Sequence, residues 1–90
     1  MNGITKTYSA NGTDTFDHNG KTGVAIVGFP SGVTGTVTLS HQVGTTDVTI
    51  ETFTASGGAQ FVSPLGNLKI AVTSLAGGSV SVIVQPLSDA

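Results

Sequence analysis

Hydrophobic residues occur at every second position along much of this 90-residue chain. The alternation is clearest in residues 68–72 and 80–84, where a Leu, Ile or Val stands at each even-numbered position. Successive side chains of a strand point to opposite faces of its sheet, so this pattern predicts half-buried strands. Residues 76–79 lie between the runs and include two glycines, which accept the positive φ angles of a tight turn. We therefore predict a β-hairpin over residues 66–86, with one face packed into a core.

Shorter runs of the same kind divide the rest of the chain. Asn19-Gly20 separates residues 14–18 from residues 21–29, and Asn-Gly between two strand-like runs is a strong signal for a hairpin. Residues 23–29, GVAIVGF, are apolar on both faces, which is typical of a central strand covered on two sides. The alternation changes phase near Glu51–Thr52, where we expect a β-bulge or a strand that crosses between sheets.

These runs add up to seven or eight short strands, and no segment shows a helical period. The chain is therefore predicted to be a single all-β domain over residues 1–90, a small antiparallel β-sandwich, with a small β-barrel as the alternative. Residues 2–9 fit either a first strand or part of an extended N-terminal arm over residues 1–10. A domain this small buries only about 60–65% of its unfolded surface, so we expect a thin margin of stability.

The scarcity of charge excludes several classes of function. Charged residues make up 9% of the chain and its net charge is -2, whereas about 25% is ordinary. Lys6, Lys21 and Lys69 are scattered, so the chain lacks the basic cluster that binding to nucleic acid or to a membrane surface requires. The absence of cysteine excludes disulfides and thiolate metal sites. No signal peptide or membrane-spanning run is evident, so we expect folding in the cytoplasm of the producing cell.

One polar group in the first half of the chain has the composition of a metal-binding loop. Asp14, Asp17, His18 and Asn19 lie close together, but the alternating acidic residues and closing glutamate of a calcium loop are missing. We interpret them as polar residues beside the Asn-Gly turn. His41 is in phase with apolar neighbours, where a lone histidine is more often a core or interface residue than a metal ligand. No metal site and no cofactor are predicted.

Two further groups of residues have a functional and a structural interpretation. Ser40, His41 and Asp47 have the composition of a catalytic triad, but adjacent strand residues point to opposite faces, so Ser40 and His41 cannot face each other. Threonines at alternate positions of residues 34–38 and 52–54 resemble an ice-binding or sugar-binding surface, and also the solvated outer face of a sandwich. We favour the solvated face and predict no catalytic residues.

The edges of the predicted sheets indicate more about function than these polar residues do. Monomeric proteins usually protect their edges with lysines or other charges, and this chain has few. Residues 23–29, Val62 and Ile83 also add apolar surface. Other subunits would have to cover the edges and one face, unless short loops or bulges hide the edges. The chain is therefore expected to form a homo-oligomer.

Three segments carry a resemblance to a known group of proteins. They are GTVTLS (35–40), TIETFTASGG (49–58) and PLGNLKIAVTSLAGGSVSVIVQP (64–86). The portion from about Val33 to Pro86 resembles the small Gly/Thr/Val-rich β-sandwich proteins found among the structural genes of tailed bacteriophages. The resemblance implies a part of the virion, such as a capsid decoration (cement) protein or a head, tail or fibre accessory subunit. It transfers no individual site residues.

The expected function is therefore a non-enzymatic one. A decoration subunit made in the host cytoplasm would bind the outer capsid, bridge copies of the major capsid protein and stabilise the virion. A trimer is favoured, because capsids have threefold positions. Residues 2–9 would reach a neighbour, with Ile4 and Tyr8 as apolar contacts. The alternative function is an Ig-like or carbohydrate-binding adhesion module.

Overall fold

The computed structural model describes residues 3–19, 22–62 and 65–86, and these form eight β-strands. No helix occurs in the described part of the chain. The alternating pattern thus gives strands throughout, as the sequence predicts. In chain order the strands are β1 (Ile4–Tyr8), β2 (Gly12–Asn19), β3 (Thr22–Gly28), β4 (Thr34–Val43), β5 (Thr46–Phe53), β6 (Gly57–Val62), β7 (Leu65–Ala76) and β8 (Val80–Pro86).

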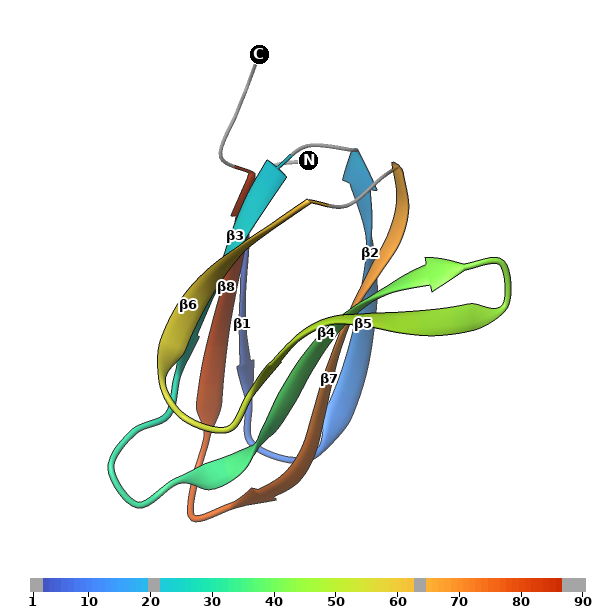
Figure 1. Ribbon diagram of the computed structural model, residues 1–90. Coiled ribbons are helices and arrows are strands. Elements are labelled where there is room, and N and C mark those ends of the chain that lie inside the picture. The colour runs from blue at the N-terminus through green and yellow to red at the C-terminus, as the bar shows by residue number, and fades with distance from the viewer. Residues whose placement is uncertain (1–2, 20–21, 63–64, 87–90) are drawn as a thin grey trace.

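The strands form two four-stranded sheets that face each other (Figure 1). Sheet A has the order β1-β8-β3-β6 and sheet B the order β2-β7-β4-β5, with all neighbours antiparallel. β1 pairs with β8, β2 with β7, β3 with β6 and β4 with β5, so the chain forms one long antiparallel ribbon wound into two layers. This arrangement is a jelly roll. The predicted β-sandwich is confirmed, and the alternative of a closed barrel is not.

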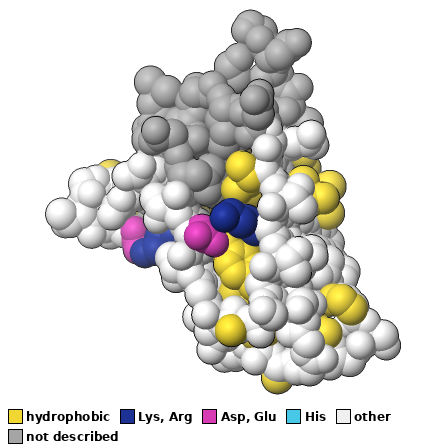
Figure 2. Space-filling model, turned by 180° about the vertical axis from the view of Figure 1, so that it is seen from behind, with side chains coloured by type: hydrophobic (Ala, Val, Ile, Leu, Met, Phe, Trp, Pro, Cys, Tyr) yellow, Lys and Arg dark blue, Asp and Glu magenta, His cyan; other side chains and the backbone are white. Residues whose placement is uncertain are grey.

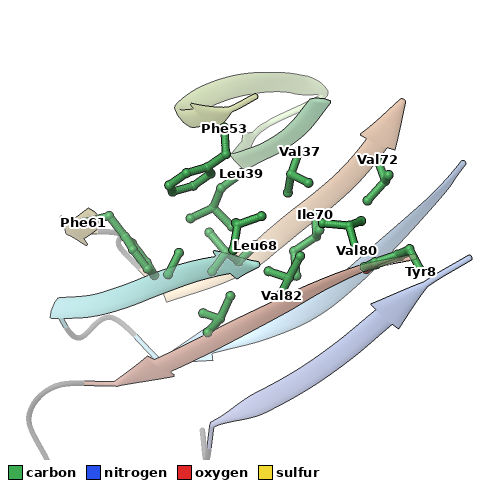
Figure 3. Close-up of a cluster of buried hydrophobic side chains, with 13 residues drawn as sticks. Tyr8, Val37, Leu39, Phe53, Phe61, Leu68, Ile70, Val72, Val80 and Val82 are labelled. Atoms are coloured by element: carbon green, nitrogen blue, oxygen red, sulfur yellow. The ribbon is translucent and has the colours of Figure 1, made fainter. Parts of the chain in front are cut away.

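The core lies between the two sheets (Figure 3). Its most completely buried side chains come from β7 and β8, where Leu68, Ile70 and Val80 have no exposed surface. Burying each such side chain contributes about 1.5–3 kcal/mol. The inward residues are Tyr8, Ala25, Val27, Val37, Leu39, Phe53, Phe61, Leu68, Ile70, Val72, Val80, Val82 and Val84.

Both predicted hairpins that end in glycine turns are wrong. β7 lies in sheet B and β8 in sheet A, so residues 76–79 connect the two sheets. β2 and β3 likewise belong to different sheets and do not pair with each other, and the predicted turn residue Gly20 lies outside the described residues. Alternation and a glycine turn specify where strands begin and reverse, but not which strands pair, because an arch between sheets needs the same turn residues. Among the described strands, only β4 and β5 are both consecutive and paired, across a turn at Gly44, which has φ 65°.

Residues 4–8 form an integral strand of sheet A. β1 pairs with β8 along its whole length, from Ile4 opposite Val84 to Tyr8 opposite Val80. Of the two alternatives for this segment, the structure shows the first strand. Residues 4–8 therefore do not extend away from the sandwich as an arm.

Two β-bulges break the ladders of sheet B. Leu39 pairs with Glu51 and Ser40 with Thr49, which leaves Ile50 as the extra residue of β5. This confirms the predicted bulge, one residue before its expected position, and accounts for the change of phase. β7 has a second irregularity opposite Thr34–Thr36, where Ser74 has φ 56°.

Candidate functional site

The outer surface of sheet A is the feature that best fits a binding role. Along β3 the buried residues are Gly23, Ala25 and Val27, so the intervening side chains point outward. The same alternation and the strand register place the outward residues of β1, β6 and β8 on this surface. We call this surface the uncharged face, because no charged side chain of the described residues lies on it. Its side chains are Thr5, Thr7, Thr22, Val24, Ile26, Gln60, Val62, Ser81, Ile83 and Gln85.

The centre of the uncharged face is apolar. Ile26 lies opposite Ile83 on one side and opposite Gly58 on the other, and 48% of Ile26 is exposed. Half-buried Val24 extends the apolar strip along β3. The sequence predicts that this strand is central and covered on both faces. β3 is central, but no other described element packs on its outer face, where 48% of Ile26 is exposed.

The outer surface of sheet B has a different character. Lys69 Nζ forms an ion pair with Asp47 Oδ2 at 2.6 Å, and Asn67 Nδ2 donates to Gln42 Oε1 at 3.3 Å. The threonines of the predicted ladders at residues 36, 38 and 52 lie on this surface. Its polar groups bond to one another across strands, as expected for a solvated face.

The surface view agrees with this scarcity of charge. Figure 2 shows the molecule from behind, with basic and acidic side chains gathered in small groups and most of the remaining described surface uncharged. Hydrophobic side chains reach the surface on the right of this view, the side on which sheet A lies when Figure 1 is turned. In this view the exposed hydrophobic side chains form several separate patches among uncharged atoms.

β6 forms one border of the uncharged face and is an edge strand. Its hydrogen-bonded neighbour is β3, and the described residues supply no strand on its other side. Residues 57–62, GGAQFV, contain no charge and no proline, the usual devices that protect a sheet edge. Val62 is 77% exposed, so this edge, which has no further described strand beside it, carries exposed apolar surface.

The two predicted contact residues, Ile4 and Tyr8, lie on the inner side of β1. Tyr8 is 8% exposed, and its hydroxyl donates to Asp14 Oδ2 at 2.7 Å. Burial raises the pKa of Tyr8 far above its ordinary value, and the hydrogen bond to Asp14 and its negative charge raise it further. Ile4 is half-buried and packs against the core. The structure therefore gives Tyr8 a role in holding β1 and β2 together.

Of the four polar residues that resemble a metal-binding loop, the structure describes the side chain of one. Asp14 accepts the hydrogen bond of Tyr8, while the side chains of Asp17, His18 and Asn19 lie outside the described residues. In the part of the chain described, no three His, Cys, Asp or Glu side chains come together as a metal site would require. The same part contains no helix long and apolar enough to span a membrane.

His41 points into the sandwich and is 7% exposed. Of the two predicted positions, core or interface, the structure shows the core, but neither ring nitrogen has a hydrogen-bond partner among the described residues. Ser40 lies on the opposite face of β4, where it is paired with Lys69, and Asp47 forms the ion pair with Lys69. The three residues therefore do not form a catalytic triad.

Comparison with known proteins supports the fold alone. No family model and no curated protein matches the chain. Among solved structures, the chain is similar to a de novo designed double-stranded β-helix determined by solution NMR, with a TM-score of 0.51 and 14% sequence identity. The match covers 94% of this chain and 97% of the designed one. A double-stranded β-helix is a wound antiparallel ribbon, in agreement with the pairing described above.

Sequence reasoning identified residues 23–29, Val62 and Ile83 as apolar surface that other subunits would cover, but it did not place them together on one face. The signal was present, since residues 23–29 are apolar on both faces and residues 57–62 lack charge. What the sequence does not specify is that both segments lie side by side in one sheet, with Ile26 opposite Gly58.

Proposed function

We propose that this chain is a non-enzymatic structural subunit that acts by binding other protein subunits. The observation that carries the proposal is the uncharged face, which has an apolar centre and polar borders. Protein interfaces have this composition, with charged residues depleted at the core and polar groups at the rim. Thr7 and Ser81, whose hydroxyl oxygens lie 3.2 Å apart, belong to the polar border.

We further propose that the assembly is a bacteriophage virion and that the chain decorates its capsid. This step is supported by the resemblance of residues 33–86 to phage β-sandwich proteins. Jelly rolls are common in viral capsid proteins, although this fold also serves lectins and cupins and does not determine function. The chain would bind the major capsid protein through the uncharged face and stabilise the shell by mass action.

A carbohydrate-binding function has less support. Sugar-binding sites commonly stack the sugar ring on an exposed aromatic side chain, and the only tyrosine of the chain is buried in its core. The chain has no tryptophan. The described outer face of sheet A presents β-branched aliphatic residues at its centre, which favour contact with protein.

The experiment is co-sedimentation of the purified chain with capsids of the encoding phage prepared without it. We expect saturable binding and slower release of DNA on heating. Ile26→Lys places a charge at the centre of the uncharged face, where the side chain is already half exposed, and is expected to weaken binding about tenfold or more.

Thr73→Lys is the matched control, because it adds the same charge to an exposed position on the outer surface of sheet B. We expect this variant to bind as the wild type does. Absence of binding by the wild-type chain would contradict the proposal of capsid decoration. Equal loss of binding in both variants would contradict the assignment of the uncharged face.

A further inference from the structure

Each sheet has two edges, and the four edge strands differ in charge. β1 carries Lys6, β2 carries Asp14 and Asp17, and β5 carries Asp47 and Glu51. β6 carries no charged residue. This difference decides which edge can pair with the same edge of a second copy.

Twofold antiparallel pairing of identical edges has a fixed geometry. The axis is perpendicular to the sheet, so both copies keep the same face outward, and residues of equal orientation lie opposite each other. Antiparallel pairing of two β1 strands about their central residue would place Lys6 opposite Lys6 of the second copy. Pairing of β5 could bring Asp47 opposite Glu51, and pairing of β2 would double its acidic charge. Like charges directly opposite destabilise a sheet, so these three edges oppose self-pairing.

We propose that two copies of this chain associate through β6, in an antiparallel pair centred on Gln60. In this register Gln60 lies opposite Gln60 of the second copy, and Val62 lies opposite Gly58. The side-chain amides of the two Gln60 residues can hydrogen-bond to each other, because each has a donor and an acceptor. The pair joins both copies of sheet A into one eight-stranded sheet.

The register also covers the most exposed of the large hydrophobic side chains among the described residues. Val62 is 77% exposed, and Gly58 of the second copy presents no side chain against it. Gly58 lies opposite Ile26, and a Cβ added at Gly58 would be 3.4 Å from Ile26 Cγ1. Val62 of one copy therefore packs over Gly58 toward Ile26 of the other, which is itself 48% exposed. The twofold axis repeats this contact.

A twofold contact also covers both copies of β6 at once. A head-to-tail contact between β6 and a different edge would leave one β6 unpaired at one end of the assembly, unless the subunits closed into a ring. The trimer expected from capsid symmetry needs such a ring, so the measured mass separates the two arrangements. The β6 contact rests on the proposed function, since it describes how two copies of a structural subunit meet. Sedimentation of the purified chain measures this contact without any capsid.

The test is sedimentation equilibrium of the wild-type chain and of charge variants at Gln60. The contact is smaller than a standard interface, so we expect a dimer with a dissociation constant of about 1–100 μM. Gln60→Lys and Gln60→Glu each place like charges opposite each other and are expected to weaken the dimer about tenfold. An equimolar mixture of the two variants places opposite charges together and is expected to restore association.

Gln85→Lys is the matched control, since it makes the same substitution on the same face but on β8, an interior strand of sheet A. It is expected to dimerise as the wild type does. A monomeric or trimeric wild-type chain, or a Gln85→Lys variant as weak as Gln60→Lys, would overturn the β6 contact. So would a mixture of Gln60 variants that stays monomeric. Capsid binding by a chain that does not form the β6 dimer would leave the proposed function standing.

Discussion

Tyr8 closes one side of the sandwich through a single hydrogen bond. Its ring is buried among residues of both sheets, and its hydroxyl reaches Asp14 on β2, an edge strand of the opposite sheet. The neutral phenol donates to the carboxylate, whereas the phenolate would face it with like charge. Folding therefore favours the protonated form of this side chain.

Tyr8→Phe tests this contact and its dependence on pH. The variant loses one hydrogen bond to a charged group and is expected to lose about 1–2 kcal/mol of stability at neutral pH. Because folding raises the pKa of Tyr8, the wild-type contribution is complete below the unfolded pKa of about 10 and falls as pH rises above it. Urea unfolding of both proteins across this range gives the difference in stability. A difference that stays constant above pH 10 would contradict the direction of the shift.

The connection between β7 and β8 shows how a glycine turn joins the two sheets. Gly77 and Gly78 have φ angles of 87° and 145°, which other residues rarely adopt. A Cβ at Gly77 would also collide with the carbonyl oxygen of Gly32, in the β3–β4 connection. Two connections at the same end of the sandwich therefore pack together at this glycine.

Gly77→Ala is expected to destabilise the protein by about 2 kcal/mol or more, through backbone strain and the contact with Gly32. Gly28→Ala is the matched control, because its φ is not positive and no atom lies within 4 Å of the added Cβ. Its effect is expected to stay within about 0.5 kcal/mol. Thermal unfolding compares the two variants, and equal midpoints would contradict the strain assigned to Gly77.

The individual strands were predictable from sequence, whereas their pairing was not. Alternation identified the inward residues of β7 and β8, and the change of phase near Glu51 located the bulge at Ile50. Pairing depends on contacts between segments far apart in the chain. For example, Ile4 pairs with Val84, and no local signal specifies that partner. The same limit hid the candidate site, because Gly58 and Ile26 meet only after the ribbon has wound.

The N-terminal segment had two interpretations, a first strand or an arm. The structure places Ile4 and Tyr8 in an edge strand, where both face the core. Asn11 is itself structural, since its Oδ1 accepts a hydrogen bond at 2.9 Å from the backbone N–H of Leu75, beside the irregular part of β7. This hydrogen bond satisfies the backbone N–H of Leu75, which lies near the break in the ladder between β4 and β7.

At the scale of the whole molecule, the two outer surfaces differ in polarity and charge. Sheet B presents threonines and the ion pair of Lys69 with Asp47, which suit contact with water. Sheet A presents the uncharged face and ends in β6, an edge with no protecting charge. A small domain of low charge gains solubility and stability if another subunit covers this side.

Hydrogen–deuterium exchange measured at increasing protein concentration tests this interpretation most directly, because it reports which edge becomes covered. We expect exchange in residues 57–62 to slow as the chain associates, while the edge strands β1, β2 and β5 keep their rates. Exchange in residues 57–62 that is independent of concentration, or protection that appears at another edge, would contradict the assignment of β6 as the strand through which two copies associate.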